Sequence, residues 1–149
     1  MSTGIMPNVG EEYVQRLLAN DLSTITSWTV GLYDDSTDSL SDISDVGDII
    51  TEPTGGSYSK TTVSLPGDIT IGVNASDNIY IEAVDQTFDV SDSSVEVDAY
   101  FIVVSYQSTV VNSESGANDH LLFNGSLNNT LNLNNWAEYT ARDIRGVLD

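Results

Sequence analysis

Acidic side chains dominate this chain, and they limit how it can fold. The sequence holds 23 Asp and Glu residues against 4 Lys and Arg, which gives a formal net charge of −19. A buried unpaired charge costs several kcal/mol. The four basic side chains can pair with only a few of the 23 carboxylates, so nearly every carboxylate must lie at the surface. The core must therefore come from the 40% of residues that are hydrophobic.

The length and hydrophobic content predict one folded domain over residues 1–149. A chain of about 150 residues can bury roughly 70% of its unfolded surface around a single core. High net charge is typical of disordered chains, but 2 Trp, 7 Tyr and 3 Phe supply enough apolar surface to oppose that outcome. No internal repeat and no Pro-rich or Gly-rich linker divides the chain.

Charge and composition exclude several classes of partner and site. Phosphate binding needs clustered basic side chains, so we expect neither nucleic acid nor an anionic membrane surface as a partner. Cysteine is absent, which excludes disulfides, thiolate nucleophiles and Cys-based zinc sites. The N-terminal residues show no basic start followed by an apolar run, and no 18 consecutive residues are apolar, so we expect no signal peptide and no membrane span. The four basic residues are scattered: Arg16, Lys60, Arg142 and Arg145.

Helical periodicity occurs near the start of the chain, over residues 8–22. Asn8 followed by Glu11 predicts an N-cap with a capping box. An apolar stripe at spacings of three and four usually packs on the protein's own core, and a partner-binding face is the alternative. The stripe consists of Val9, Tyr13, Val14, Leu17 and Leu18.

After this helix the apolar period changes to two, which is typical of strands with one apolar face. Trp28, Val30 and Leu32 begin the pattern. Turn residues separate the later segments. These further strands are predicted at 58–65, 69–73, 79–84, 87–90, 95–106, 120–123 and 143–148.

Many short strands with turns between them predict a mainly β fold. We expect an antiparallel β-sandwich or jelly roll, with strands between residues 26 and 148 and the short amphipathic N-terminal helix covering one end or edge. Residues 99–104 are apolar on both faces, so they should form a central strand that is covered on both sides.

An acidic segment at residues 34–48 resists assignment to a strand. It is either an exposed loop or a loop with a short helical turn held by three apolar side chains, Leu40, Ile43 and Val46. Its acidic residues resemble an EF-hand calcium loop, although Ser39 replaces the usual Gly and Asp45 is shorter than the usual Glu. We expect no metal or other cofactor, and the only candidates for a calcium site are Asp34, Asp38, Asp42 and Asp45.

Catalysis has no recognisable site in the sequence. His120 is the only histidine, and neither a G-x-S-x-G turn nor a Gly-rich phosphate loop is present. A lone histidine at the start of a strand is usually a surface or capping residue. We therefore expect no enzyme activity and no catalytic residue.

Several stretches of the chain follow one another in a familiar order: N-x-G with EEYVQRLLAND, WTVGLY, TEP, SYSK, FDVSDSSVEVDAYFIVVSYQS and HLLFNGSLNNTLNL. This order of motifs resembles small virion structural proteins of tailed viruses. The resemblance covers residues 8–148, and it is greatest to proteins encoded among the head and tail genes of tailed viruses that infect halophilic archaea. A single lysine and the excess of Asp over Glu are also similar to halophilic proteomes.

The resemblance implies a β-rich virion component outside the capsid shell, made in the host cytoplasm and carried in the virion. A decoration or turret protein is one possibility, and a tail-tip, baseplate or fibre-attachment protein is the other. Its partners would be the major capsid protein or tail proteins and further copies of itself. Two apolar surfaces could mediate such contacts: the Tyr13 and Leu17 stripe, and the Trp136 and Tyr139 segment. An extracellular calcium-binding adhesion or surface-layer module is an alternative from another class.

The charge predicts that stability depends on salt. Lowering NaCl from about 3 M to about 0.1 M lengthens the Debye length from below about 3 Å to about 10 Å, so surface carboxylates repel one another and the melting temperature should fall. Protonation near pH 5 should partly replace salt, because it lowers the repulsion. Circular dichroism melts across the salt series at pH 7 and pH 5 measure both effects. A melting temperature indifferent to salt would contradict the assignment to a saline habitat.

Overall fold

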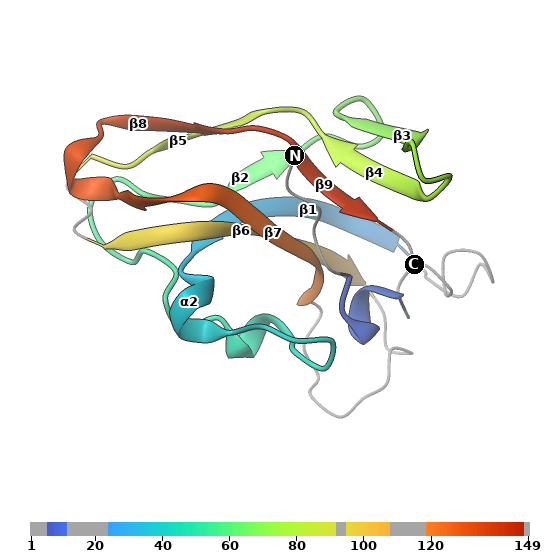
Figure 1. Ribbon diagram of the computed structural model, residues 1–149, viewed down its shortest axis with the longest axis horizontal. Helices are drawn as coiled ribbons and strands as arrows, with labels where there is room; N and C mark the ends of the chain where they lie inside the picture. The colour runs from blue at the N-terminus through green and yellow to red at the C-terminus, as the bar shows by residue number, and fades with distance from the viewer. Residues whose placement is uncertain (1–5, 12–23, 92–94, 108–118, 148–149) are drawn as a thin grey trace.

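The computed structural model describes residues 6–11, 24–91, 95–107 and 119–147 (Figure 1). These residues form a mainly β fold in which all paired strands are antiparallel. The strands are β1 (Thr24–Tyr33), β2 (Thr61–Val63), β3 (Ile69–Val73), β4 (Ile79–Ala83), β5 (Gln86–Asp89), β6 (Glu96–Gln107), β7 (Asp119–Asn132), β8 (Glu138–Ala141) and β9 (Ile144–Val147). The short helices are α2 (Asp35–Asp38), η1 (Val46–Asp48) and η2 (Leu133–Asn135).

The strands are arranged in layers around one four-stranded sheet of order β2-β1-β6-β7. A three-stranded sheet, β3-β4-β9, and the β5-β8 pair lie on one side of it, as Figure 1 shows along the top of the molecule. The acidic loop with α2 and η1 lies on the other side, at the bottom of the same view. The four-stranded sheet therefore has a cover on each face.

Strand β6 is the centre of this arrangement, as its sequence predicted. It pairs with β1 on one side and β7 on the other. Side chains at alternate positions enter two separate cores. The first core, toward the smaller sheets, takes Val97, Tyr100, Ile102 and Val104, and the second core, toward the acidic loop, takes Ala99, Phe101 and Val103.

Two glycines allow the aromatic residues of β6 to lie flat on their neighbours. Gly31 on β1 faces Phe101, and a Cβ at residue 31 would stand 2.3 Å from the Phe101 ring. Gly125 on β7 faces Tyr100, and a Cβ there would stand 2.5 Å from the Tyr100 hydroxyl oxygen. Both strands thus use glycine where another side chain would displace a core ring.

The Tyr100 hydroxyl connects the two layers by hydrogen bonds. It crosses over Gly125, accepts from the backbone N–H of Arg145 at 2.9 Å and donates to the Arg145 carbonyl at 3.1 Å. Arg145 lies on β9, whose neighbour in its sheet is β4. This one side chain therefore satisfies two backbone groups of β9 that the β4 pairing leaves on the other edge.

Most of the predicted strands are confirmed, and the differences lie late in the chain. The β8 strand was not predicted, and β7 continues to Asn132 where the sequence analysis ended a strand at residue 123. Residues 124–132 are mostly polar, with two leucines four residues apart, so their sequence has no period-two apolar alternation, and β6 pairs with them at 124–126 and 131–132. No helix among the described residues is long and apolar enough to cross a membrane.

The predicted N-terminal helix is described only over residues 8–11; the rest of it lies outside the described residues. The assignment of Asn8 as N-cap was wrong by one residue, because the Pro7 carbonyl already accepts from Gly10 and Glu11. Val9, the first residue of the apolar stripe, packs against the second core. At this position the stripe faces the protein's own core.

Replacing Tyr100 by Phe should destabilise the protein by about 1–3 kcal/mol, because the β9 backbone groups lose a buried partner while the ring still fills the core. Urea unfolding at about 3 M NaCl measures the change in the free energy of unfolding.

Tyr80→Phe on β4 is the matched control. The Tyr80 hydroxyl makes no hydrogen bond within the described part of the chain, so its loss should change the free energy of unfolding by less than about 0.5 kcal/mol. Equal effects of the two substitutions would contradict the role assigned to the Tyr100 hydroxyl.

Candidate functional site

The acidic loop is a structured cover for the second core. Leu40 and Val46 pack against this core, together with Ile49, and a one-turn helix α2 begins the loop. Of the two alternatives that the sequence left open for this segment, the structure shows a loop with short helical turns, held by Leu40 and Val46. Ile43 does not help to hold it, because its side chain is 84% exposed.

The candidate calcium ligands have separate structural roles. Asp34 caps α2 by accepting from the Ser36 backbone and from the Ser36 and Thr37 hydroxyls, and these hydrogen bonds lower its pKa. One oxygen of Asp38 accepts from the backbone N–H groups of Ile50 and Thr51 and from the Thr51 hydroxyl at 2.7 Å. These bonds close the two ends of the loop onto each other.

Asp42 and Asp45 complete the set of four aspartates. Asp42 is exposed, and its side chain forms no hydrogen bond within the described residues. Asp45 caps η1 and faces β7. In the part of the chain that the structure describes, no group of three or more Asp, Glu or His residues lies together in a way that could hold a metal ion. The structure therefore does not bring Asp34, Asp38, Asp42 and Asp45 into one site.

Asp45 joins the loop to the edge of the four-stranded sheet. One carboxylate oxygen accepts from the Leu121 backbone N–H at 2.9 Å, and the other lies 3.1 Å from Nδ1 of His120. Burial opposes ionisation of this carboxyl, but hydrogen bonds from His120, Leu121 and Val46 outweigh it and lower the pKa of Asp45. His120 is itself buried, with 7% of its surface exposed. The pair fixes the loop to β7, which is the last strand of the sheet.

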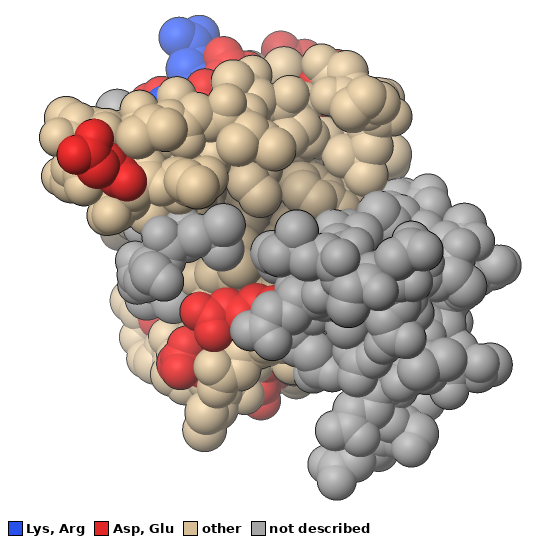
Figure 2. Space-filling view, turned by 90° about the vertical axis from the view of Figure 1, so that its right-hand side faces the viewer, with Lys and Arg blue, Asp and Glu red and all other residues tan. Residues whose placement is uncertain are grey.

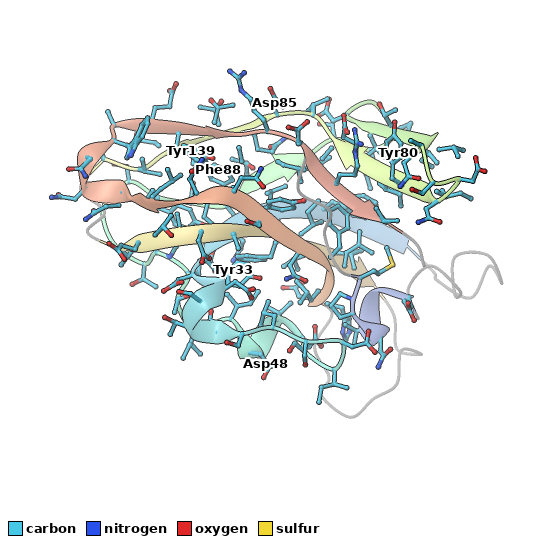
Figure 3. All side chains as sticks on the ribbon, viewed as in Figure 1. Tyr33, Asp48, Tyr80, Asp85, Phe88 and Tyr139 are labelled. Atoms are coloured by element: carbon cyan, nitrogen blue, oxygen red, sulfur yellow. The ribbon has the colours of Figure 1, made fainter. Side chains whose placement is uncertain are left out.

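A second set of polar contacts fixes the start of the loop. The Tyr33 hydroxyl donates to Asp35 at 2.9 Å and accepts from the Asn124 side-chain amide at 2.8 Å. Asp98 on β6 accepts from the Asp35 backbone N–H at 2.7 Å. Burial raises the pKa of Tyr33, and the bond to Asp35 raises it further, so this hydroxyl stays protonated. Tyr33 lies between the sheet and the loop in Figure 3.

An uncovered apolar surface lies at the far end of the three-stranded sheet. Along one face of β3 and β4, Ile69, Ile81 and Ala83 contact the first core. The same face continues beyond the core, where the remaining side chains are exposed. The exposed fractions are 69% for Ile71, 63% for Val73 and 48% for Ile79. We call these three residues the hairpin patch.

The opposite face of this sheet carries polar and ionic contacts. Arg145 on β9 lies 4.1 Å above the centre of the Tyr80 ring and forms an ion pair with Glu82. Tyr80 is labelled at this end of the molecule in Figure 3. The two faces of the β3-β4 hairpin thus differ: one is closed by its own cation–π and ionic contacts, and the other leaves apolar side chains in water.

Figure 2 views this end of the molecule directly. Above the grey residues, its surface is mostly tan, with few acidic side chains. The only charged residue in the segment from Ile69 to Ile81 is Asp77, in the turn between the strands. In a chain with a net charge of −19, an extended surface that is both apolar and nearly uncharged is a candidate contact surface.

The two apolar surfaces that the sequence indicated as possible contacts differ from the hairpin patch. Trp136 is 46% exposed and packs edge-on against Tyr139, with 6.2 Å between the ring centres. The Tyr13 and Leu17 stripe lies outside the described residues. Ile43 and Ile50 are more exposed than any of these, at 84% and 78%, but they stand on the acidic loop among carboxylates.

The sequence pattern predicted β3 and β4 but did not identify the hairpin patch. Alternating apolar residues at 69, 71 and 73 are typical of any strand with one buried face. The signal was present, but nothing in the sequence indicates that the core ends halfway along the hairpin.

Comparisons with protein-family models, with curated protein sequences and with solved structures find no match to this chain.

Replacing Asp45 by Asn should lower the stability at pH 7 by about 1 kcal/mol, because the carboxylate is partly exposed and loses its charge-assisted bonds. The pKa of Asp45 is lowered by folding, so its contribution is present above the unfolded value of about 3.9 and disappears as the pH falls through the folded value. The difference between the native and variant chains should therefore shrink below about pH 4. Urea unfolding at pH 7 and pH 3 measures it.

Asp42→Asn removes the same charge from the same loop without removing a hydrogen bond, so it controls for relief of repulsion. It should be neutral or slightly stabilising. If Asp45→Asn behaves like Asp42→Asn at pH 7, the anchoring role of Asp45 is wrong.

Proposed function

We propose that this protein is a structural component of a virus particle, placed on the outside of the capsid as a decoration or turret protein of a tailed virus of halophilic archaea. The resemblance of residues 8–148 to such proteins is the source of the proposal. The structural observation that carries it is the hairpin patch, an apolar surface kept free of charge on an otherwise acidic protein. A protein that works by assembly needs a surface of this kind.

The use of the polar side chains supports the same proposal. Asp34, Asp38 and Asp45, which could have formed a ligand site, instead hold the loop on the sheet. His120 takes part in the same anchoring. These residues build a rigid scaffold, and the calcium-binding adhesion module is less well supported because its ligands are committed to backbone groups.

The layered β architecture also agrees with a virion role. We take the four-stranded sheet and the smaller sheets that cover its first core as a variant of the β-sandwich, related to the jelly rolls from which many virion components are built. The acidic exterior suits a particle in concentrated brine, where salt screens the repulsion between neighbouring subunits.

Purified virus particles test the proposal directly. Quantitative mass spectrometry should find this protein at a copy number comparable with that of the major capsid protein, and antibodies should label intact particles over the whole capsid. Capsid decoration requires both results, since a decoration protein repeats with the capsid lattice.

A few copies per particle, with label at one vertex or along the tail, would instead place the protein at the tail tip, baseplate or fibre attachment. Absence from washed particles would contradict a structural role in the virion. The major capsid protein is the internal standard for a high copy number, and a non-virion host protein is the standard for absence from the particles.

A further inference from the structure

We infer that the open edge of strand β3 pairs with the same strand of a second copy, antiparallel and centred on Ile71, and that this contact joins the hairpin patches of the two copies. The inference rests on the proposed function, which requires the chain to assemble with itself. It assigns the contact surface and the register, neither of which the proposed function determines.

Within the described residues, the backbone groups of Ile71 and Val73 have no hydrogen-bond partner along the outer edge of β3. β3 is the terminal strand of its sheet, with β4 as its sheet neighbour among the described residues. Asn74 N–H donates to the Asn78 carbonyl at 3.0 Å, and Val84 N–H donates to the Asp68 carbonyl at 2.9 Å, so residues 68 and 74 bond toward β4.

Bonded and non-bonded pairs alternate in an antiparallel ladder, which determines the direction of every other backbone group. Thr70 and Gly72 also bond toward β4. Ile69, Ile71 and Val73 therefore direct their backbone groups toward the open edge, where Ile69 N–H is already used by the Pro66 carbonyl at 3.2 Å.

This edge has none of the usual protection against strand pairing. Natural edge strands carry charges, prolines or bulges that prevent another strand from adding. β3 has the sequence ITIGV, with no charged residue and no proline, and its pairing with β4 is regular from Ile69 to Val73. By contrast, side chains occupy edge N–H groups of the four-stranded sheet: Asp45 accepts from Leu121 at the edge of β7, and the Tyr58 hydroxyl accepts from Leu32 where β2 no longer covers β1.

Charge favours a second copy as the occupant at this register. With Ile71 opposite Ile71, Ile69 faces Val73 of the other copy, and Asp68 faces the neutral Asn74. The acidic residue of the turn, Asp77, lies beyond the paired segment. No carboxylate therefore opposes another, although each copy carries a net charge of −19.

The same register gains both backbone and side-chain contacts. Each Ile71 can exchange N–H and C=O bonds with its counterpart, and Val73 N–H of one copy can donate to the Ile69 carbonyl of the other. Residues that face each other across a ladder share a face of the sheet, so the two hairpin patches become continuous. The two-fold relation uses the same surface on both copies and closes at a dimer.

Sedimentation equilibrium of the purified chain at about 3 M NaCl tests the pairing, with one exposed isoleucine changed to lysine in each variant. The native chain should form a dimer. Ile71→Lys should weaken the dimer roughly tenfold or more, because two lysines would face each other across the edge. Ile50→Lys is the matched control: it changes a residue of similar exposure, 78% against 69%, and should leave the dimer unchanged.

The absence of cysteine allows a second test that does not depend on tolerance of lysine. In the proposed register the Cα atoms of the two residues at position 71 lie about 5.5 Å apart, which a disulfide can span. On mild oxidation, Ile71→Cys should form covalent dimers faster than Ile50→Cys, which crosslinks only by collision.

A native chain that stays monomeric at about 3 M NaCl overturns the pairing, whatever protein covers the edge in a particle. Equal association of Ile71→Lys and Ile50→Lys, or equal crosslinking of the two cysteine variants, also overturns it. These outcomes differ from failure of the proposed function. A chain found in particles that does not pair through β3 keeps the proposed function and loses this inference, whereas a β3 dimer absent from particles does the reverse.

Discussion

Burial of strand β6 on both faces is the constraint on which the rest of the structure depends. Tyr100 and Phe101 are adjacent in sequence and fully buried on opposite sides of the sheet, so each side needs its own cover. The smaller sheets cover the first core. An acidic segment that would otherwise be a solvated loop must cover the second, and it does so with Leu40, Val46 and Ile49.

A chain with few basic residues has to hold such a loop in place without salt bridges to Lys or Arg. Each of the three basic residues within the described ranges lies beside a carboxylate: Lys60 beside Glu52, Arg142 beside Asp85 and Arg145 beside Glu82. The aspartates of the loop instead accept hydrogen bonds from backbone N–H groups and hydroxyls. A carboxylate that accepts from backbone N–H groups is stabilised without a counter-charge, so the acidic composition contributes to the fold as well as to the surface.

The distribution of charge also separates the surfaces of the molecule. Exposed isoleucines on the acidic loop stand among carboxylates, where a second acidic molecule is repelled. The exposed Ile71 of β3 stands on a strand without charge, whose backbone edge is open. Apolar exposure alone does not distinguish these surfaces; the neighbouring charges and the free backbone groups do.

The apolar pattern of the chain was enough to predict the mainly β class, the doubly buried central strand at residues 99–104 and the positions of most strands. Burial on one face leaves a period-two apolar pattern along a strand, and burial on both faces leaves a continuous one. The sequence also indicated that Leu40 and Val46 hold the acidic segment. It did not predict β8 or the second half of β7, because residues 124–132 lack a period-two apolar pattern and pair with β6 only at 124–126 and 131–132. Only the tertiary structure decided that Asp34, Asp38 and Asp45 bind backbone groups separately, since their spacing along the chain is compatible with one shared ion. It also decided that Ile71, Val73 and Ile79 extend past the core, because a strand's alternation is the same whether its apolar face meets a core or water.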